Sequence, residues 1–451
     1  MASGVKNLFK VYLKRNNSIM KPLENPVLVL GGGIAGITAA LELSRLGHAV
    51  ILAEKSPFLG GRAAHFTCKA TDTCQKCGAC LVEQRLIELF AAPHLLVETQ
   101  AQLTACGREN GQFRCTLKGQ PLLVDPKRCI NCSLCATECP AAEAGAVVTT
   151  SQVPHHPRYA ILPEHCLHFL EGSCRVCADL CPTGAIDLNR QERELDLTVA
   201  AMVVATGYQP ADPRELSHYG YGYVPGVITG VELEDLLRHG FEQLLQGEGR
   251  QLRRVAFIQC VGSRNSRHPY CSRVCCAYTL RLARLIKHRL PDCQVTTFYM
   301  DLQNVGQTPG EFLATVQEEI TTIRALPGIV AGTAAGTVKV RYVEESTGQA
   351  LFEEFDLVVL SVGMGAGRDN QALGSMLHLD LTQESFFQPA DAEEQATTSQ
   401  PGVFLAGTAL GPMSIPESIA QATAAAWRVH RYLEETFHRG RSLGLRPQPT
   451  P

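Results

Sequence analysis

The sequence contains no run of about 18 or more uncharged apolar residues, the length that a membrane-spanning helix requires. Residues 1–20 are basic and amphipathic, but they lack the apolar core and the small-residue cleavage site of an export signal. The formal net charge of −3 gives no reason to expect nucleic acid as a partner. We therefore expect a cytoplasmic chain that neither crosses a membrane nor binds nucleic acid.

The chain is long enough for two or three domains with a large core. It has 451 residues, of which 45% are hydrophobic and 19% are charged, as in ordinary soluble globular proteins. Residues 1–24 form either a helical arm that packs on a partner or a solvated tail. No Ser/His/Asp triad or other substrate-binding constellation stands out, so the chemistry has to be sought elsewhere in the sequence.

Cysteine is abundant, with 19 residues, and its spacing is informative. Without an export signal, a disulfide framework is not indicated. Sixteen cysteines fall into four local groups of four, which indicates metal binding. Cys106, Cys115 and Cys293 stand alone, and we interpret them as buried small apolar residues rather than redox groups.

Residues 27–36 (VLVLGGGIAG) predict a buried strand that runs into Gly31-x-Gly33-x-x-Gly36. A helix and a second strand that ends at Glu54 follow, as in a βαβ unit. The first two glycines permit a tight turn and close approach to a pyrophosphate, and the third permits close helix–strand packing. The acidic residue about 20 positions later can bind ribose hydroxyls. This unit predicts a dinucleotide site.

Three further segments favour FAD over NAD. A second glycine pair precedes Arg62, a buried strand ends in Ala205-Thr206-Gly207, and Gly407-Thr408 lies between a strand and a long Ala-rich helix. Flavoproteins with two dinucleotide domains place such segments beside the flavin, although most have Asp where this chain has Thr408. The predicted FAD contacts are Gly31, Gly33, Ala35, Gly36, Glu54, Lys55, Gly61, Arg62, Ala205, Thr206, Gly207, Gly407, Thr408 and Ile415.

Residues 251–365 predict a second dinucleotide-type domain. Its first strand, Val255 to Gln259, would normally continue into a glycine loop, but here it leads to Cys260. No GxGxxG is present, so NAD(P)H binding is disfavoured. We expect residues 210–250 and 366–400 to be connecting and surface segments.

The most specific pattern is Cys129-x2-Cys132-x2-Cys135-x3-Cys139-Pro140, which is the bacterial ferredoxin sequence. A second half follows, with a longer first gap: Cys166-x7-Cys174-x2-Cys177-x3-Cys181-Pro182. In such pairs the last cysteine of each half ligates the other cluster. One [4Fe–4S] cluster is therefore assigned to Cys129, Cys132, Cys135 and Cys181, and the other to Cys139, Cys166, Cys174 and Cys177. Zinc is the competing interpretation.

Two more groups of four cysteines lie in the dinucleotide domains. The first comprises Cys68, Cys74, Cys77 and Cys80; it could hold a cluster or zinc, or supply Cys77 and Cys80 as a redox dithiol. The second comprises Cys260, Cys271, Cys275 and Cys276, with three arginines between them. It could hold a cluster or act as a catalytic thiol pair. We favour a cluster in both.

These elements together are typical of an α/β, thioredoxin-reductase-like flavoprotein with two dinucleotide-binding domains and an inserted ferredoxin domain. We predict an N-terminal arm (1–24), three parts of an FAD domain (25–120, 191–250 with a linker, and 376–435), the ferredoxin domain (121–190), the second domain (251–375) and a C-terminal tail (436–451).

The sequences GGGIAG, QCVGSRNSRHPYCSRVCC, YMDLQ and AGTALGPMSIPES resemble the A subunit of heterodisulfide reductases, which are FAD and iron–sulfur proteins. The resemblance covers residues 25–435 and implies a cluster at Cys260, Cys271, Cys275 and Cys276. Longer members carry another ferredoxin domain, whereas this chain has no cysteine after Cys293. Members credited with electron bifurcation place a lysine near flavin N5 where this chain has Arg281, which does not readily give up its proton.

We predict an oxidoreductase that contains FAD and four [4Fe–4S] clusters and transfers electrons within an anaerobic multi-subunit complex. The resemblance implies partners of the heterodisulfide reductase, hydrogenase, formate dehydrogenase or aromatic-ring reductase type, in a hetero-oligomer that could itself be dimeric. The alternative is a self-contained FAD oxidoreductase that reduces a disulfide or ferredoxin through Cys275 and Cys276 or Cys77 and Cys80. A structural scaffold with degenerate sites is the third hypothesis, which the intact glycine loop disfavours.

Overall fold

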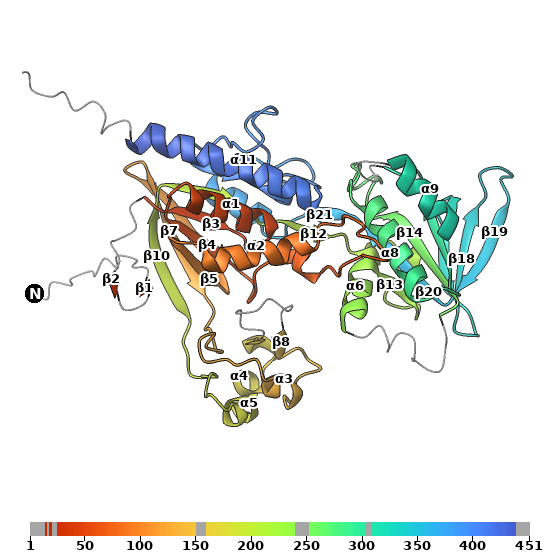
Figure 1. The fold of residues 1–451 in the computed structure, drawn as a ribbon, viewed down its shortest axis with the longest axis horizontal. Helices are drawn as coiled ribbons and strands as arrows, with labels where there is room; N and C mark the ends of the chain where they lie inside the picture. The colour runs from red at the N-terminus through yellow and green to blue at the C-terminus, as the bar shows by residue number, and fades with distance from the viewer. Residues whose placement is uncertain are drawn as a thin grey trace, which may run out of the picture.

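The computed structural model describes residues 14–15, 18–19, 25–149, 159–239, 252–303 and 309–438. Apart from β1 (Lys14–Arg15) and β2 (Ser18–Ile19), which pair antiparallel, the N-terminal arm lies outside the described residues, as does most of the C-terminal tail. Figure 1 shows two bodies side by side and a smaller module below the first. No helix within the described ranges has the length and apolar character needed to cross a bilayer.

The first body is built on a five-stranded parallel sheet in the order β22-β11-β3-β4-β5. Its central strands are apolar and buried on both faces, as expected for a covered parallel sheet. The strands are β3 (Val27–Leu30), β4 (Val50–Glu54), β5 (Leu95–Thr99), β11 (Ala201–Val204) and β22 (Val403–Leu405).

Helices cover one face of this sheet and a second sheet covers the other. Helices α1 (Ile34–Arg45), α2 (Cys80–Ala91) and α11 (Ile415–Leu433) pack on Val27, Val29, Val50 and Leu52. The opposite face packs on the antiparallel sheet β10-β7-β6 and on helix α10 (Asn370–Leu377). The bounds of that sheet are β6 (Ala101–Glu109), β7 (Gln112–Gly119) and β10 (Arg193–Val199).

The second body repeats the parallel-sheet architecture, with strand order β13-β20-β14-β15-β16. Helices α6 (Gly230–His239), α8 (Cys275–Arg289) and α9 (Pro309–Glu319) cover one face, and the antiparallel sheet β17-β18-β19 covers the other. The strands are β13 (Val227–Thr229), β14 (Arg254–Val261), β15 (Gln294–Tyr299), β16 (Thr321–Arg324), β17 (Ile329–Gly332), β18 (Val338–Val343), β19 (Ala350–Phe355) and β20 (Leu357–Val362).

A short antiparallel ribbon connects the two bodies: β12 (Tyr208–Pro210) carries the chain into the second body, and β21 (Met364–Ala366) brings it back. Parts of 210–250 and 366–400, which we expected to be connecting and surface segments, belong to the two bodies themselves. Strand β13 pairs with β20 at the edge of the second sheet. Helix α10 contributes Leu373 and Leu377 to the core of the first body, so it lies outside the second body that we extended to residue 375.

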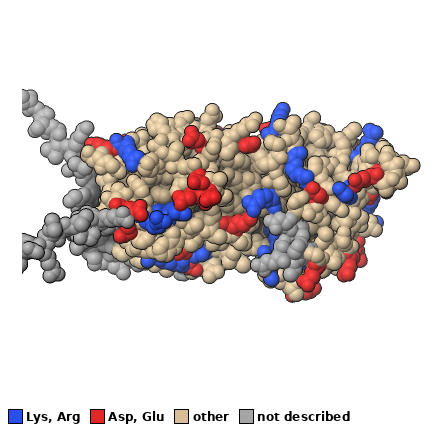
Figure 2. Space-filling view, turned by 90° about the horizontal axis from the view of Figure 1, so that it is seen from above, with Lys and Arg blue, Asp and Glu red and all other residues tan. Residues whose placement is uncertain are grey.

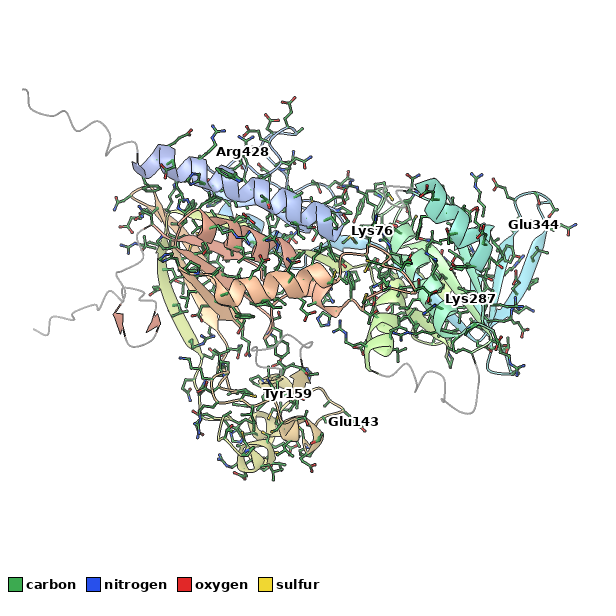
Figure 3. All side chains as sticks on the ribbon, in the orientation of Figure 1. Lys76, Glu143, Tyr159, Lys287, Glu344 and Arg428 are labelled. Atoms are coloured by element: carbon green, nitrogen blue, oxygen red, sulfur yellow. The ribbon has the colours of Figure 1, made fainter. Side chains whose placement is uncertain are left out.

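The cysteine-rich module is inserted between β7 and β10, which are themselves paired along their length. It has its own small core, which includes Leu123, Ile161 and Leu188. Its elements are α3 (Leu134–Thr137), β8 (Val147–Thr149), β9 (Tyr159–Ile161), the 3₁₀ turn η2 (Pro163–His165), α4 (Leu167–Glu171) and α5 (Val176–Leu180). In Figure 3, Tyr159 and Glu143 lie in this module and Lys76 lies where the two bodies meet.

Candidate functional site

All three parts of the molecule contribute to one cavity of about 1350 Å³. The first body contributes its glycine loop, the second contributes the start of α8, and the module contributes Val148, Thr149 and Leu162. The volume exceeds the roughly 300–1,000 Å³ of ordinary ligand pockets, so an extended ligand such as a dinucleotide can be accommodated. Outside the cavity, charges of both signs are interspersed on the face shown in Figure 2.

The glycine loop forms the part of the cavity next to α1. Gly31 has φ +107°, and a Cβ there would lie 2.3 Å from the carbonyl oxygen of Ala205. A Cβ on Gly33 would approach nothing closer than the Cα of Gly61, at 3.9 Å, so the space beside it is open. Gly33 caps α1, whose first amides have no partner within the helix. An open backbone next to a helix N-terminus suits a pyrophosphate.

Gly36 has a different role, because a Cβ there would lie 1.8 Å from the carbonyl oxygen of Gly31. It permits the close packing of helix on loop that its spacing predicted. Glu54 is buried at the end of β4, where its carboxylate accepts hydrogen bonds from the amides of Gly32 (2.6 Å) and Ser56 (2.7 Å). The loop thus orients this carboxylate in the cavity wall, the position from which it could bind ribose hydroxyls.

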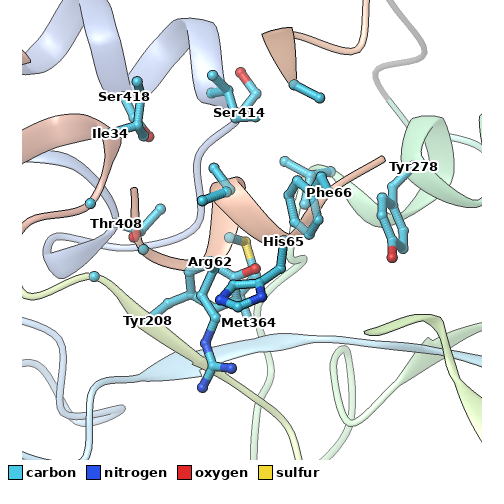
Figure 4. A pocket seen from close by; sticks show the side chains of 18 of the residues that line it. Ile34, Arg62, His65, Phe66, Tyr208, Tyr278, Met364, Thr408, Ser414 and Ser418 are labelled. Carbon is cyan, nitrogen blue, oxygen red and sulfur yellow. The ribbon is translucent and has the colours of Figure 1, made fainter. Parts of the chain in front are cut away.

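The structure brings twelve of the fourteen predicted FAD contacts to this cavity. They are Gly31, Gly33, Ala35, Glu54, Lys55, Gly61, Arg62, Ala205, Thr206, Gly207, Thr408 and Ile415. Gly36 and Gly407 do not line the cavity; the amide of Gly407 donates a hydrogen bond to the side chain of Gln421 (2.7 Å). Figure 4 shows Arg62, Tyr208 and Met364 grouped on one side of the pocket, and Ser414 at the N-terminus of α11 on another.

Helix α11 begins with a capping box, in which Ser414 and Glu417 bond to each other's amides. The second body is tied to this helix start, because the guanidinium of Arg273 pairs with Glu417 (2.5 Å). The residues present therefore fit FAD: an open glycine turn, a buried carboxylate and a helix N-terminus all face one dinucleotide-sized cavity.

The 68–80 cysteine group meets this cavity at one edge. Cys74 and Cys77 line it, whereas Cys68 and Cys80 do not; of the four, only Cys77 is partly buried. The sulfur of Cys74 accepts a hydrogen bond from the Lys76 amide (3.4 Å). Two of the four predicted ligands thus border the cavity; of the other two, Cys68 lies on the same loop and Cys80 is the first residue of α2.

The second group lies at the end of β14 and the start of α8. The Cys275 thiol is hydrogen-bonded to Cys260 and to Cys276, and these bonds raise its pKa. The bond from Cys275 lowers the pKa of Cys276 to about 7, and Cys276 also accepts from the Gln303 amide (3.4 Å). Cys271 lies on the same loop, where its sulfur accepts from the Arg273 amide (3.2 Å). Cys275 thus lies next to two of the other three predicted ligands, and it also lines the cavity.

Two buried polar side chains lie close to Cys260 in the sequence. Both side-chain amide atoms of Gln259 and the hydroxyl of Ser263 are buried without a hydrogen-bond partner in the described structure. Such groups are costly to bury, and an unexplained one indicates a missing partner. The sulfurs of an iron–sulfur cluster accept hydrogen bonds. The side chains of Gln259 and Ser263, which precede and follow Cys260 in the sequence, can supply such hydrogen bonds and therefore fit a cluster at this group.

One of the two predicted sets of ferredoxin cysteines lines a single cavity. Cys139, Cys166, Cys174 and Cys177 line one small cavity. Burial, followed by the thiols of Cys166, Cys139 and Cys174, raises the pKa of Cys177 to about 11.

The other half of the module gathers around Cys135. Burial, followed by the thiols of Cys129, Cys177 and Cys132, raises the pKa of Cys135 to about 12. Cys181 accepts a hydrogen bond from the Ala185 amide (3.3 Å). Over the described ranges, no set of three or more His, Cys, Asp or Glu side chains is arranged to hold a metal ion. A cubane cluster holds its thiolates farther apart than a single ion does.

A buried ion pair that the sequence did not indicate lies in the cavity wall. Lys69, on the cysteine loop of the first body, pairs with Glu234 of α6 in the second body; their side chains are only 2% and 1% exposed. Glu234 also accepts from the amide (2.8 Å) and hydroxyl (2.6 Å) of Thr67. The Lys69 ammonium lies over the rings of Phe66 (5.2 Å) and Tyr278 (5.3 Å). Lysine is seldom buried, so no local pattern could have identified this one.

Arg281 lines the cavity, as expected for a residue near the flavin. Burial lowers its pKa, while the thiols of Cys77 and Cys74 oppose that effect. Its guanidinium lies 5.9 Å from the ring centre of Phe312. Arg281 is thus a half-buried cation near the 68–80 cysteine group.

Two family models match the chain: an FAD-dependent oxidoreductase over residues 26–131 and a 4Fe-4S dicluster domain over 128–185. Both cofactor types expected from the motifs are supported by these matches. Among solved structures, thioredoxin reductases from Lactococcus lactis and T. acidophilum each have a TM-score of 0.50, at 13% and 14% identity. They cover 91% of this chain and 100% and 99% of their own lengths, which confirms the predicted fold.

Curated relatives are similar along most of this chain. The A subunit of the H(2):CoB-CoM heterodisulfide,ferredoxin reductase from Methanothermobacter marburgensis is 32% identical over 91% of the chain. An iron–sulfur A subunit of the CoB–CoM heterodisulfide reductase from Methanopyrus kandleri is 33% identical over 92%. The corresponding protein of the ferredoxin/F(420)H(2)-dependent reductase from Methanosarcina acetivorans is 32% identical over 94%. The chain spans 65%, 65% and 55% of these relatives' lengths, respectively.

Proposed function

Since this chain is homologous to the A subunits of heterodisulfide reductases, we propose that it is an oxidoreductase subunit that moves electrons between FAD and iron–sulfur clusters. The observation that carries the proposal is the shared cavity. The glycine loop, Cys74 and Cys77 of one cysteine group and Cys275 of another all line it. Bound FAD accepts electrons in pairs and passes them on singly, which connects two-electron chemistry to one-electron clusters.

The ferredoxin module supports the same function by its position. Strands β8 and β9 lie between two cavities: Val148 and Thr149 line the large one, whereas Val147 and Ile161 line the small cysteine cavity. One two-stranded ribbon thus separates the two spaces. We infer that the cluster at Cys139, Cys166, Cys174 and Cys177 exchanges electrons with the flavin, and that the second ferredoxin cluster lies farther along the path.

The second body supports a cluster in place of a nicotinamide. Strand β14 carries Cys260, with φ +60°, as its last residue but one, and α8 begins at Cys275. In a nucleotide-binding domain this strand–helix turn would hold glycines for a pyrophosphate. Here buried thiols occupy the turn, so electrons leave this body through iron and not as hydride.

We propose four [4Fe–4S] clusters per chain, ligated by the four cysteine groups, and a cytoplasmic complex with other redox subunits. Partners of the heterodisulfide reductase, hydrogenase, formate dehydrogenase or aromatic-ring reductase type fit a subunit without a substrate-binding constellation of its own. Electron bifurcation is not part of the proposal, because Arg281 keeps its proton over the physiological range.

Anaerobic purification followed by iron, acid-labile sulfide and flavin analysis tests the proposal. At four Fe per cubane, about 16 Fe and one FAD per chain are expected. About 8 Fe with one FAD would instead favour the self-contained oxidoreductase that uses free cysteine pairs. Protein without flavin absorbance or iron would support a scaffold. Cys293→Ser is the matched control, because this thiol belongs to no group and its replacement should leave the iron content unchanged.

A further inference from the structure

Two cysteines that stand alone in the sequence meet in the antiparallel sheet of the first body. Cys106 of β6 is directly opposite Cys115 of β7, and their sulfurs are 3.6 Å apart. Cys115 is buried, with its sulfur 3.8 Å from that of Met202, whereas Cys106 is partly exposed at the edge of the same core. The expectation that both are isolated apolar residues does not describe this arrangement.

The turn between the strands determines the geometry of the pair. Asn110 and Gly111 have φ +51° and +80°, the left-handed conformations of a two-residue type I′ hairpin. The residues that flank such a turn exchange hydrogen bonds, and hydrogen-bonded and non-hydrogen-bonded pairs then alternate along the ladder. Cys106 and Cys115 form the fourth pair from the turn, so theirs is a non-hydrogen-bonded position.

Non-hydrogen-bonded positions bring facing side chains closest together, with Cα atoms about 4.5 Å apart. Disulfides form at Cα separations of about 4.4–6.8 Å, so the backbone needs no rearrangement. The sulfurs would have to approach by roughly 1.6 Å to reach the ~2.05 Å of a disulfide bond. Side-chain rotation can supply a movement of this size.

We propose that Cys106 and Cys115 form a dithiol–disulfide site that reacts with low-molecular-weight disulfides. Neither residue belongs to a cysteine group, so the site is independent of the clusters and of the proposed function. The more exposed Cys106 is the attacking thiol, and the buried Cys115 resolves the intermediate. A hydrogen bond from the Cys115 thiol lowers the pKa of Cys106, which favours the reactive thiolate on that residue.

The reaction balances in two exchanges. The Cys106 thiolate attacks one sulfur of RSSR; the RS–SR bond breaks, a Cys106–S–S–R bond forms and RS⁻ leaves. Cys115 then loses its proton to solvent and attacks the Cys106 sulfur, and a second RS⁻ leaves. Two protein thiols are oxidised by two electrons, RSSR is reduced to two RSH, and the two released protons reside on the RSH products.

The site lies on a strand that leads to the ferredoxin module. β7 pairs with both β6 and β10, and the module is inserted between β7 and β10. A disulfide would therefore join the hairpin covalently at the sheet that supports the module. In a reducing cytoplasm such a bond is expected to be reversible.

Peptide mapping provides the test. The full protein, purified anaerobically with its cofactors, is treated with glutathione disulfide, quenched in acid, alkylated and digested with trypsin. Cleavage at Arg85, Arg108, Arg114 and Lys118 places the two cysteines in separate peptides, 86–108 and 115–118, each with a single cysteine. We expect these peptides to be recovered joined by a disulfide, and separate after dithiothreitol.

Two variants and an internal reference define the mechanism. Cys115→Ser should accumulate a glutathione adduct on Cys106, whereas Cys106→Ser should leave Cys115 largely unmodified. Cys293, in the core of the second body, should be recovered in its alkylated form in every sample, because it does not react with glutathione disulfide. The proposal would be overturned if the two wild-type peptides were recovered alkylated and unlinked, or if Cys106 were joined to a different cysteine. Because this result comes from the wild-type protein, it does not depend on the folding of either variant.

Discussion

The buried pair between Lys69 and Glu234 yields a quantitative prediction about how the two bodies are held together. Lys69→Met removes the ammonium but keeps an unbranched side chain that can occupy the same space. Glu234 would then remain 1% exposed without the ammonium that pairs with it. Removing one partner of a buried ion pair typically costs about 3–5 kcal/mol, because the remaining charge is desolvated without compensation. Contact of the ammonium with Phe66 and Tyr278 adds to this cost.

The assay is urea unfolding of the loaded protein, followed by circular dichroism and by flavin fluorescence. The double variant Lys69→Met/Glu234→Gln should be destabilised by less than the sum of the two single variants, by about 1–3 kcal/mol, because it leaves no isolated charge. The Gln side chain can still accept from Thr67. The exposed pair of Lys118 and Glu192 is the matched control, and Lys118→Met should leave the unfolding midpoint essentially unchanged.

The reasoning about this pair would be refuted by either of two results. The first is a Lys69→Met variant as stable as the wild type, which would mean that the ammonium does not compensate Glu234. The second is strict additivity in the double-variant cycle, which would mean that the two side chains do not interact.

Three further predictions concern the cofactor sites. Gln259→Met should lower the reduction potential of the cluster at Cys260, Cys271, Cys275 and Cys276 without changing the iron content. The substitution removes a buried hydrogen-bond donor, and such donors stabilise the more negative reduced state of a cluster. An unshifted potential in an EPR-monitored redox titration would contradict this prediction. Cys139→Ser and Cys129→Ser should each remove about four Fe, but should eliminate different EPR signals; loss of the same signal from both would exclude the crossed assignment. Gly33→Val should leave the protein folded but abolish FAD binding, whereas Gly36→Val should prevent folding. Circular dichroism reports the folding of each variant, and flavin titration reports FAD binding. Tight FAD binding by Gly33→Val would exclude the loop as the pyrophosphate site.

The sequence alone predicted the features that depend on short-range spacing. A ferredoxin half places its thiols within a few residues of one another, so the local backbone positions them. The same applies to the glycine loop, in which Gly31 and Gly36 are needed for a turn and a helix contact only five residues apart. The βαβ order then predicted a two-domain flavoprotein fold, which the thioredoxin reductase comparisons confirm.

Other features of the fold and of the site could not be recognised in the sequence. Residues 210–250 contain no long periodic run, so β13 was not recognised; three residues become a strand only because β20 offers a paired edge. For the 68–80 group the sequence did not indicate that Cys74 and Cys77 line the cavity and that Cys68 and Cys80 do not.

By itself the sequence determined the kinds of groups that this protein carries: sixteen grouped thiols, a dinucleotide loop and a strand that ends in cysteine where glycines would be expected. Only the tertiary structure decided which of them meet. Lys69 and Glu234 are 165 residues apart in the chain and belong to different bodies. Cys106 and Cys115 face each other because a two-residue turn determines the register of a hairpin. Such contacts depend on packing and strand register, which no local residue pattern specifies.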